Sequence, residues 1–280
     1  MQLVLILLSL LVCNVEILAY YNHVYKSKPK ITVQNMSSKN VSPWFSNINS
    51  LTNIFQPVQK KNAVNNGKND IELELIRITT IINDNISLLT NAAETKNENS
   101  DEVVKALSSL EKLMREKNKL DNGITGDETI KYLNGSWRLI FTTGTVDSQK
   151  KLGGRINYFP LKAVQSFNVD TSIIANGIYI GDFALIKFFG QFTWNNKSRK
   201  LEFDFDQIQL LGLKFNLPSG GAAKIGQSTG LGSENNEQLI TTGKRPFFNW
   251  ISADSNIATA RGGGGGLALW RRIDLGIEGN

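Results

Sequence analysis

The sequence has very few of the side chains that most often carry chemistry at neutral pH. Its 280 residues include one histidine, His23, and one cysteine, Cys13, and both lie near the N-terminus. The rest of the chain therefore has neither a Ser-His or Cys-His nucleophile pair nor a zinc site built from His and Cys. We predict no catalytic residue, no metal and no cofactor, and a protein that is not an enzyme. Carboxylate or tyrosine chemistry stays open.

Acidic residues are almost absent from the first 69 positions. This stretch holds seven lysines, no arginine and one acid, Glu16, which leaves 24 of the 31 basic residues and 24 of the 25 acidic residues for the remainder. The net charge of +6 therefore belongs wholly to the N-terminal stretch. A nucleic-acid-binding protein would carry its basic patch on the folded part, where it neutralises phosphates, so nucleic acid is not an expected partner.

The N-terminal stretch divides into two segments with the composition of targeting signals. Residues 3–12 form an apolar run that is shorter than the roughly 20 residues needed to span a bilayer, so we interpret residues 1–19 as a signal peptide. Residues 20–69 contain lysines, many Asn and Ser and no acid, which is typical of a transit peptide. The alternatives are a core helix or membrane anchor for the first segment and a disordered basic linker for the second.

A signal peptide followed by a transit peptide resembles the bipartite presequence of proteins imported into plastids of secondary origin. Tyr20 and Tyr21 stand where such transit segments often begin with an aromatic residue. The sequence therefore predicts a plastid location. Ordinary secretion is the alternative, and glycosylation of the Asn-x-Ser sequons would favour it. These sequons begin at Asn35, Asn40, Asn85, Asn134 and Asn196.

Two stretches between residues 70 and 120 have helical periodicity. Apolar residues fall near one 3.6-residue stripe in each stretch: Ile71, Leu75, Ile78, Ile82 and Leu89, then Val103, Leu107, Leu110 and Met114. Ser100 and Asp101 can cap the second helix, and Glu111 and Arg115 have the spacing of an i,i+4 ion pair. We predict a helical hairpin over residues 70–120 that packs on the rest of the fold. A membrane-surface role is less favoured, because the polar faces lack a basic excess.

From Gly135 onward the periodicity changes to two, which is typical of strands with one face toward water. In the run KLEFDFD (residues 200–206) three apolar residues alternate with three acids, which we interpret as a solvated face. These acids are Glu202, Asp204 and Asp206. The apolar parity shifts after them, which predicts a β-bulge near Asp206–Gln207. Further strands are predicted at residues 163–169, 172–180, 184–194, 257–261 and 267–273.

Consecutive strands without crossover helices must be antiparallel, and closing such a sheet removes its edges. We therefore expect a mainly β fold over residues 133–274, an antiparallel barrel of about 8–10 strands preceded by the helical hairpin. A barrel of about eight strands can hold one small ligand. Residues 262–266 are all glycine and formally match a phosphate loop. We interpret them as a hairpin turn, because a strand follows where a helix should begin.

The start of the β region resembles the opening strand of the plastid lipid-associated proteins, also called fibrillins. The segment LNGSWRLIFTT (residues 133–143) is similar to that family's Leu-x-Gly-x-Trp-x-Leu-x-Tyr-Thr pattern. Gly135 and Trp137 match the pattern, and Phe141 stands where Tyr is usual. The segment follows a predicted helical region, as it does in the family.

The end of the β region resembles a second pattern of the same family. In DSNIATARGGGGGLALWRR (residues 254–272), Asp254, Arg261 and Gly262 match, while Ala258 stands where a second Arg is common. The resemblance covers roughly residues 71–274 and implies a lipocalin-like barrel. In lipocalins an Arg packs over the first-strand Trp at the base of the barrel, and Arg261 is the expected partner of Trp137.

The resemblance implies a protein that binds or sequesters lipids, carotenoids or quinones at plastoglobules and thylakoids, in a structural or carrier role. Its partners would be an apolar lipid or pigment and the surface of a membrane or lipid body. An apolar barrel interior rich in Phe suits such ligands, and the candidates are Phe188, Phe192, Phe203 and Phe205. The alternatives are a barrel enzyme acting on an isoprenoid or fatty-acyl substrate and a secreted lipocalin-like carrier.

Overall fold

The computed structural model describes residues 67–121, 123–218 and 245–273. The predicted signal peptide (residues 1–19) and nearly all of the predicted transit segment (residues 20–69) lie outside the described residues. The elements in chain order are α2 (Gly67–Thr95), α3 (Ser100–Leu120), α4 (Ile124–Leu133), β1 (Gly135–Thr142), α5 (Val146–Leu152), β2 (Asn157–Tyr158), β3 (Lys162–Asn168), β4 (Ile173–Ile180), β5 (Phe183–Asn195), β6 (Lys200–Leu210), β7 (Leu213–Asn216), β8 (Phe247–Ala253), β9 (Ile257–Gly262) and β10 (Leu267–Ile273).

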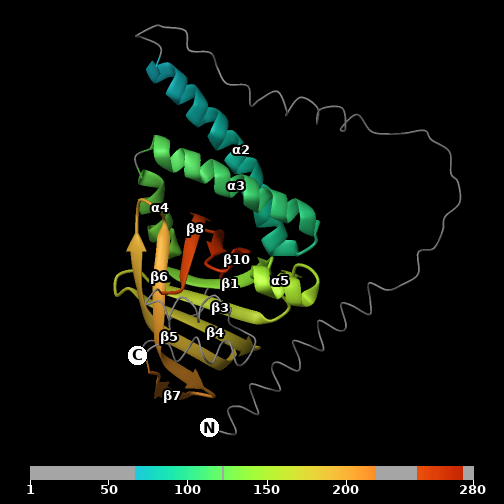
Figure 1. The fold of residues 1–280 in the computed structure, drawn as a ribbon, viewed down its shortest axis with the longest axis vertical. Helices are drawn as coiled ribbons and strands as arrows, with labels where there is room; N and C mark the ends of the chain where they lie inside the picture. The colour runs from blue at the N-terminus through green and yellow to red at the C-terminus, as the bar shows by residue number, and fades with distance from the viewer. Residues whose placement is uncertain (1–66, 122, 219–244, 274–280) are drawn as a thin grey trace, which may run out of the picture.

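The described strands form one antiparallel sheet that closes on itself (Figure 1). Its order is β10-β9-β8-β6-β5-β4-β3-β1, and β10 pairs with β1 to complete a ring of eight strands. Two short strands lie off the ring, with β2 paired to β1 and β7 paired to β6. This confirms the predicted antiparallel barrel preceded by a helical hairpin. Strands β2, β7 and β8 and helices α4 and α5 were not predicted.

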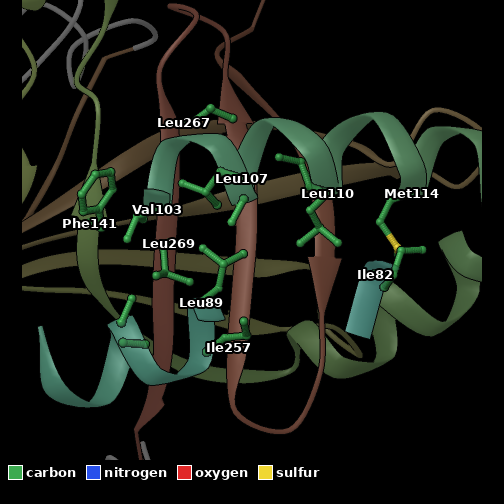
Figure 2. Close-up of a cluster of buried hydrophobic side chains, with 14 of the residues drawn as sticks. Ile82, Leu89, Val103, Leu107, Leu110, Met114, Phe141, Ile257, Leu267 and Leu269 are labelled. Atoms are coloured by element: carbon green, nitrogen blue, oxygen red, sulfur yellow. The ribbon is translucent and has the colours of Figure 1, made fainter. Parts of the chain in front are cut away.

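The helical hairpin of α2 and α3 covers the outer side of one barrel wall (Figures 1 and 2). Its buried stripe includes the predicted Val103, Leu107, Leu110 and Met114. These side chains meet apolar residues of β1, β8, β9 and β10, namely Ile140, Phe141, Ile251, Ile257, Leu267 and Leu269. The cap of α3 differs from the prediction, because Asn99 accepts the hydrogen bond from the Asp101 amide. None of the described helices is long and apolar enough to cross a bilayer.

The predicted bulge in β6 is present. Phe189 pairs with Gln207 and Gly190 pairs with Phe205, so Asp206 is the extra residue between them. The bulge brings the two backbones so close that a Cβ at Gly190 would lie 1.8 Å from the Asp204 carbonyl oxygen. A glycine is therefore required at this position of β5.

Candidate ligand-binding site

One end of the barrel interior is filled by an aromatic core. Its large members are Trp137, Phe167, Phe192, Phe203, Trp250 and Trp270, all of them buried. The rings meet edge-on or tilted, with centroids 5.2 Å apart for Trp250 and Trp270 and 5.5 Å apart for Phe167 and Trp250. Edge-to-face packing of this kind stabilises a core beyond the area that it buries. This end of the barrel is closed by side chains.

The other end of the interior is apolar, and most of its side chains are only partly buried. Ile186 and Ile208 are buried there, with four partly buried neighbours: Ile178, Phe188, Leu210 and Leu217. Phe205 joins the two ends, because its ring centroid lies 5.2 Å from that of Phe203 and 5.7 Å from that of Phe188. The structure thus brings all four candidate phenylalanines to the inner face. Phe192 and Phe203 belong to the aromatic core, whereas Phe188 and Phe205 are only partly buried.

The inner face continues past the barrel to the ends of two neighbouring hairpins. Phe215 of β7 lies opposite Ile208, and Leu213 lies opposite Leu210, so both share the inner face. We call Ile180, Phe183, Leu211, Leu213 and Phe215 the apolar tip. Their exposed fractions are 68%, 55%, 47%, 66% and 50%. The two hairpins adjoin, because the Leu211 amide donates to the Leu185 carbonyl of β5.

The turn at the end of the β6–β7 hairpin places an apolar side chain where the backbone disfavours it. Leu211 has φ 48° and Gly212 has φ 89°, both in the left-handed region. Two-residue hairpin turns with these dihedrals usually carry Asn, Asp or Gly at the first position. A leucine there is disfavoured by about 1–2 kcal/mol, and its side chain still remains half exposed.

Lysines surround the outer side of the apolar tip. Lys187 lies 5.9 Å and Lys214 lies 5.3 Å from the centroid of the Phe189 ring. Lys162 pairs with Asp182, the acidic residue in the β4–β5 turn, at 2.7 Å. The tip therefore combines a large exposed apolar area with nearby cationic groups.

The floor of the barrel is formed by Trp137 and Arg272. Trp137 is fully buried, and its indole nitrogen donates to the Leu133 carbonyl at 2.9 Å. The Arg272 guanidinium lies 4.4 Å from the centre of the Trp137 ring and donates to the carbonyls of Asn134 and Tyr132. The expectation that Arg261 packs over Trp137 is wrong. An arginine does close the floor, but it is Arg272 of β10, directly opposite Trp137 in the sheet.

Arg261 instead holds the helical hairpin to the barrel. Its Nε and Nη2 donate to the Glu111 carboxylate of α3 at 2.8 and 2.6 Å, and its Nη1 donates to the Gly265 carbonyl. This pair lowers the pKa of Glu111 and raises the pKa of Arg261, chiefly through the hydrogen bonds between them. Arg261 lies opposite Leu267, whose side chain contacts the helices, so it is on the outer face.

The other residues that match the family patterns shape turns and close approaches. The Asp254 carboxylate accepts hydrogen bonds from the Asn256 and Ile257 amides in the β8–β9 turn. The glycine run that begins at Gly262 is the hairpin turn between β9 and β10, as predicted, and strand β10 begins directly after it at Leu267. Gly135 has φ 126°, and a Cβ there would lie 2.6 Å from the Arg272 guanidinium.

The described residues offer few groups for catalysis or metal binding on the inner face. Their buried polar side chains are hydroxyls, one amide and one guanidinium, with no carboxylate among them: Thr125, Thr129, Thr143, Gln165, Arg199, Ser252 and Thr259. No cluster of three His, Cys, Asp or Glu side chains occurs in the described part of the chain. Of the acidic row, Glu202 pairs with Lys200 at 2.5 Å and Asp206 is exposed.

A cleft of about 490 Å³ lies outside the barrel, between α2, the β8–β9 turn and the end of β10. Its lining is mostly polar and includes Thr90, Glu94, Ser255, Asn256 and Arg271. Ligand pockets for apolar molecules are lined mainly by hydrophobic and aromatic side chains. The barrel interior has such a lining, whereas this cleft does not.

No protein-family model matches the chain, and no curated protein matches it. Among solved structures, the chain is similar to the crystal structure of a lipocalin-like protein from Bacteroides uniformis. The two are 12% identical, the match covers 51% of this chain and 99% of that chain, and the TM-score is 0.30. The closed barrel is established by the strand pairing of this chain itself.

Two polar residues on the inner face were not predicted from the sequence. Gln165 of β3 and Asn176 of β4 lie directly opposite each other. The alternation of β3 contains the signal for this position, because Gln165 stands two residues before Phe167 of the aromatic core and therefore shares its face.

Proposed function

We propose that this protein binds neutral apolar lipids in its barrel and works at a lipid surface, in a structural or carrier role and not as an enzyme. The observation that carries the proposal is the continuous apolar inner face, which runs from Phe205 and Phe188 to the exposed side chains of Leu213 and Phe215. Contiguous exposed apolar groups on a folded protein are typical of binding surfaces, and contact with lipid would remove them from water.

The lysines beside the apolar tip support a lipid surface as the partner. Lys187 and Lys214 lie on β5 and β7 of the two hairpins, and Lys162 of the neighbouring β3 pairs with Asp182 in the β4–β5 turn. Basic residues near a membrane surface are attracted to anionic headgroups, each contributing about 1 kcal/mol. Apolar side chains that enter the acyl boundary add to this attraction.

We also propose that the chain is a fibrillin-like protein of a secondary plastid, associated with plastoglobules or thylakoids. Two observations support this. Gly135 and Trp137, which match the opening pattern, lie at the floor of the barrel, and Asp254 and Gly262, which match the closing pattern, lie at hairpin turns. The composition of residues 1–69 supports the plastid route.

Lipid extraction from the protein purified out of its native membranes tests the binding function. We expect a neutral apolar lipid to be identified by mass spectrometry in the extract, and to be lost from the Phe188→Glu variant. The matched control is Ile124→Glu, because Ile124 is an exposed apolar residue on α4, outside the barrel interior. Absence of lipid from the unmodified protein would contradict the proposal. Chemical conversion of the lipid by the purified protein would favour the enzyme alternative.

Vesicle flotation tests the lipid surface. The full chain should float with vesicles that contain anionic lipid, and the double variant Leu213→Glu/Phe215→Glu should stay in the soluble fraction. Ile124→Glu again serves as the control and should float like the unmodified protein. Equal flotation of the double variant would show that the apolar tip does not contact the lipid surface.

A further inference from the structure

On the inner face, the side-chain oxygens of two amides lack a hydrogen-bond partner. Gln165 has an exposed fraction of 6%, and neither its Oε1 nor the Oδ1 of Asn176 is hydrogen bonded. Both oxygens are inaccessible to solvent. Buried polar atoms are hydrogen bonded in the large majority of cases, so two such oxygens in one cross-strand pair need a donor that the described residues do not supply.

The pair lies at the boundary between the two parts of the barrel interior. Along the β3–β4 pairing, one neighbouring pair on the same face is Phe167 and Ile174 of the aromatic core. The neighbouring pair on the other side includes Ile178, which packs with the partly buried apolar end. The amides therefore lie where the aromatic core ends and the partly buried apolar end begins.

The strand register places further inner-face residues at the same height in the barrel as the two amides. Gln165 lies opposite Trp137 of β1, and Asn176 lies opposite Phe188 of β5. Phe188 in turn lies opposite Ile208, which lies opposite Phe215 of the apolar tip. A molecule that contacts the amides would therefore have an apolar path toward the tip.

The chemistry of the unpaired atoms defines the group that they bind. Carboxamide oxygens accept hydrogen bonds, so the bound group must donate one. A carboxylate or phosphate would need cationic partners. On the inner face, the Arg272 guanidinium covers the Trp137 ring and donates to the Asn134 and Tyr132 carbonyls. The one buried charged residue in the described part of the chain is Arg199, and its guanidinium donates to the Met114 and Ile251 carbonyls.

We propose that Gln165 and Asn176 recognise the hydroxyl group of a neutral lipid, an alcohol or a phenol, whose apolar body extends past Phe188 toward the tip. The hydroxyl donates to an amide oxygen at the end of the aromatic core. The apolar body occupies the partly buried apolar end of the barrel, around Ile186 and Ile208. This site deepens the proposed function and rests on it, since it specifies which neutral lipid the barrel selects.

The test compares three probes of equal chain length: a long-chain alcohol, its methyl ether and the corresponding fatty acid. Their affinities for the full chain are measured by competition with a fluorescent apolar probe. We expect the alcohol to bind about tenfold more tightly than the ether, because the ether lacks the donor, which corresponds to about 1.4 kcal/mol. The fatty acid should bind no better than the ether at neutral pH.

Substitution of the amide that accepts the hydrogen bond should remove the preference without removing binding. A hydroxyl has one hydrogen to donate, so it binds one of the two amide oxygens at a time. At least one of Gln165→Leu and Asn176→Leu should therefore bring the alcohol and the ether to within about twofold of each other, since a single good hydrogen bond accounts for most of the difference. Gln191→Leu is the control, because Gln191 is an exposed glutamine of β5 outside the pair and should leave the preference unchanged.

Equal affinity of the unmodified protein for alcohol and ether would overturn the inference, and so would an unchanged preference in both leucine variants. Tighter binding of the fatty acid than of the alcohol would do the same. If none of the three probes displaces the fluorescent probe, the proposed function itself fails.

Discussion

At the scale of single residues, the barrel floor depends on the contact between Trp137 and Arg272. The Trp137 indole is buried among strands, and the Arg272 guanidinium covers its face while donating to two backbone carbonyls before β1. A cation over an aromatic face contributes about 0.5–2 kcal/mol when the contact is partly desolvated. The two side chains should therefore act as one energetic unit.

A double-mutant cycle on the free energy of unfolding tests this unit. Trp137→Ala should cost about 3–5 kcal/mol, because it removes a buried aromatic side chain. Arg272→Ala should cost less, and the double variant should show a coupling of about 0.5–3 kcal/mol in urea melts. The same cycle with Arg261→Ala is the control and should be additive, since Arg261 lies on the outer face. Additivity of the Arg272 cycle would contradict the contact.

The ion pair between Glu111 and Arg261 predicts a pH dependence. Hydrogen bonds from Arg261 hold the pKa of Glu111 below its ordinary value of 4.5. A carboxyl group whose pKa is lowered by folding stabilises the fold above its unfolded pKa, and this contribution is lost as the pH falls through the folded pKa. The pair should therefore stabilise the protein fully at neutral pH and progressively less below pH 4.5.

Glu111→Gln should lower the free energy of unfolding by about 1–3 kcal/mol at pH 7, because it replaces hydrogen bonds to a charged group. The difference between the two proteins should shrink as the pH is lowered below 4.5, where Glu111 of the unmodified protein becomes protonated. Urea melts from pH 3 to pH 7 measure the difference. A difference that stays constant over this range would show that the charge of Glu111 does not stabilise the fold.

At the scale of elements, the bulge between β5 and β6 explains how the barrel wall bends. Asp206 is the unpaired residue, and Gly190 opposite it leaves no room for a side chain. The bulge divides β6 into a part that lines the aromatic core and a part that continues to the apolar tip. The shape of the candidate site thus depends on one glycine.

Gly190→Ala should destabilise the protein by about 3 kcal/mol, because the new methyl group would overlap a backbone carbonyl and the strands would have to separate. The control is Gly154→Ala, since a Cβ at Gly154 has no atom within 4 Å. That variant should stay within about 0.5 kcal/mol of the unmodified protein. Thermal or urea unfolding measures both, and equal stability of the two variants would contradict the described bulge.

The strands that could be predicted from the sequence are those in which apolar and polar residues alternate regularly. In β6 the change of parity is visible in the residues themselves, which is why both the strand and its bulge could be predicted. In β8 it is not, because Trp250 points into the barrel while its neighbour Ile251 packs against the helices, so both faces are apolar. Helix α4 was missed because it contains buried Thr125, Gly126 and Thr129 in place of a regular apolar stripe.

The candidate site could be predicted only in part, because its residues depend on the register of closure. The alternation of residues along β5 and β6 was enough to predict that the four phenylalanines share one face of the sheet. It could not decide between Arg261 and Arg272 as the cover of Trp137, since that choice depends on which residue of β10 lies opposite Trp137. The Gln165–Asn176 pair was missed for the same reason: its oxygens are unpaired only because of what surrounds them in the closed barrel.

At the scale of the whole molecule, the barrel has two differently covered regions (Figure 1). The helical hairpin packs on β8, β9 and β10, and the apolar stripe of α3 is buried in this contact. The apolar tip lies at the far ends of β4–β5 and β6–β7, strands that do not pack on the hairpin. This separation allows the tip to contact a lipid surface while the helices stabilise the opposite wall.

The targeting prediction belongs to this scale as well. Residues 1–19 fused to a fluorescent protein should direct it into the secretory route, and residues 1–69 should direct it to the plastid. Fluorescence microscopy in cells with a secondary plastid distinguishes the two destinations. If both fusions are secreted in the same way, the transit segment does not exist and the secreted-carrier alternative gains support.

Photo-crosslinking of a ligand inside the barrel is the most direct test of the central claim, that the inner face binds a neutral lipid. The full chain is incubated with a long-chain alcohol that carries a diazirine on its chain, irradiated and digested, and the labelled peptides are identified by mass spectrometry. We predict labels on inner-face residues of β4, β5 and β6, with Phe188 and Phe205 among them. Labels confined to the outer face of α2 and α3 or to the cleft beside Thr90, or no label at all, would contradict it.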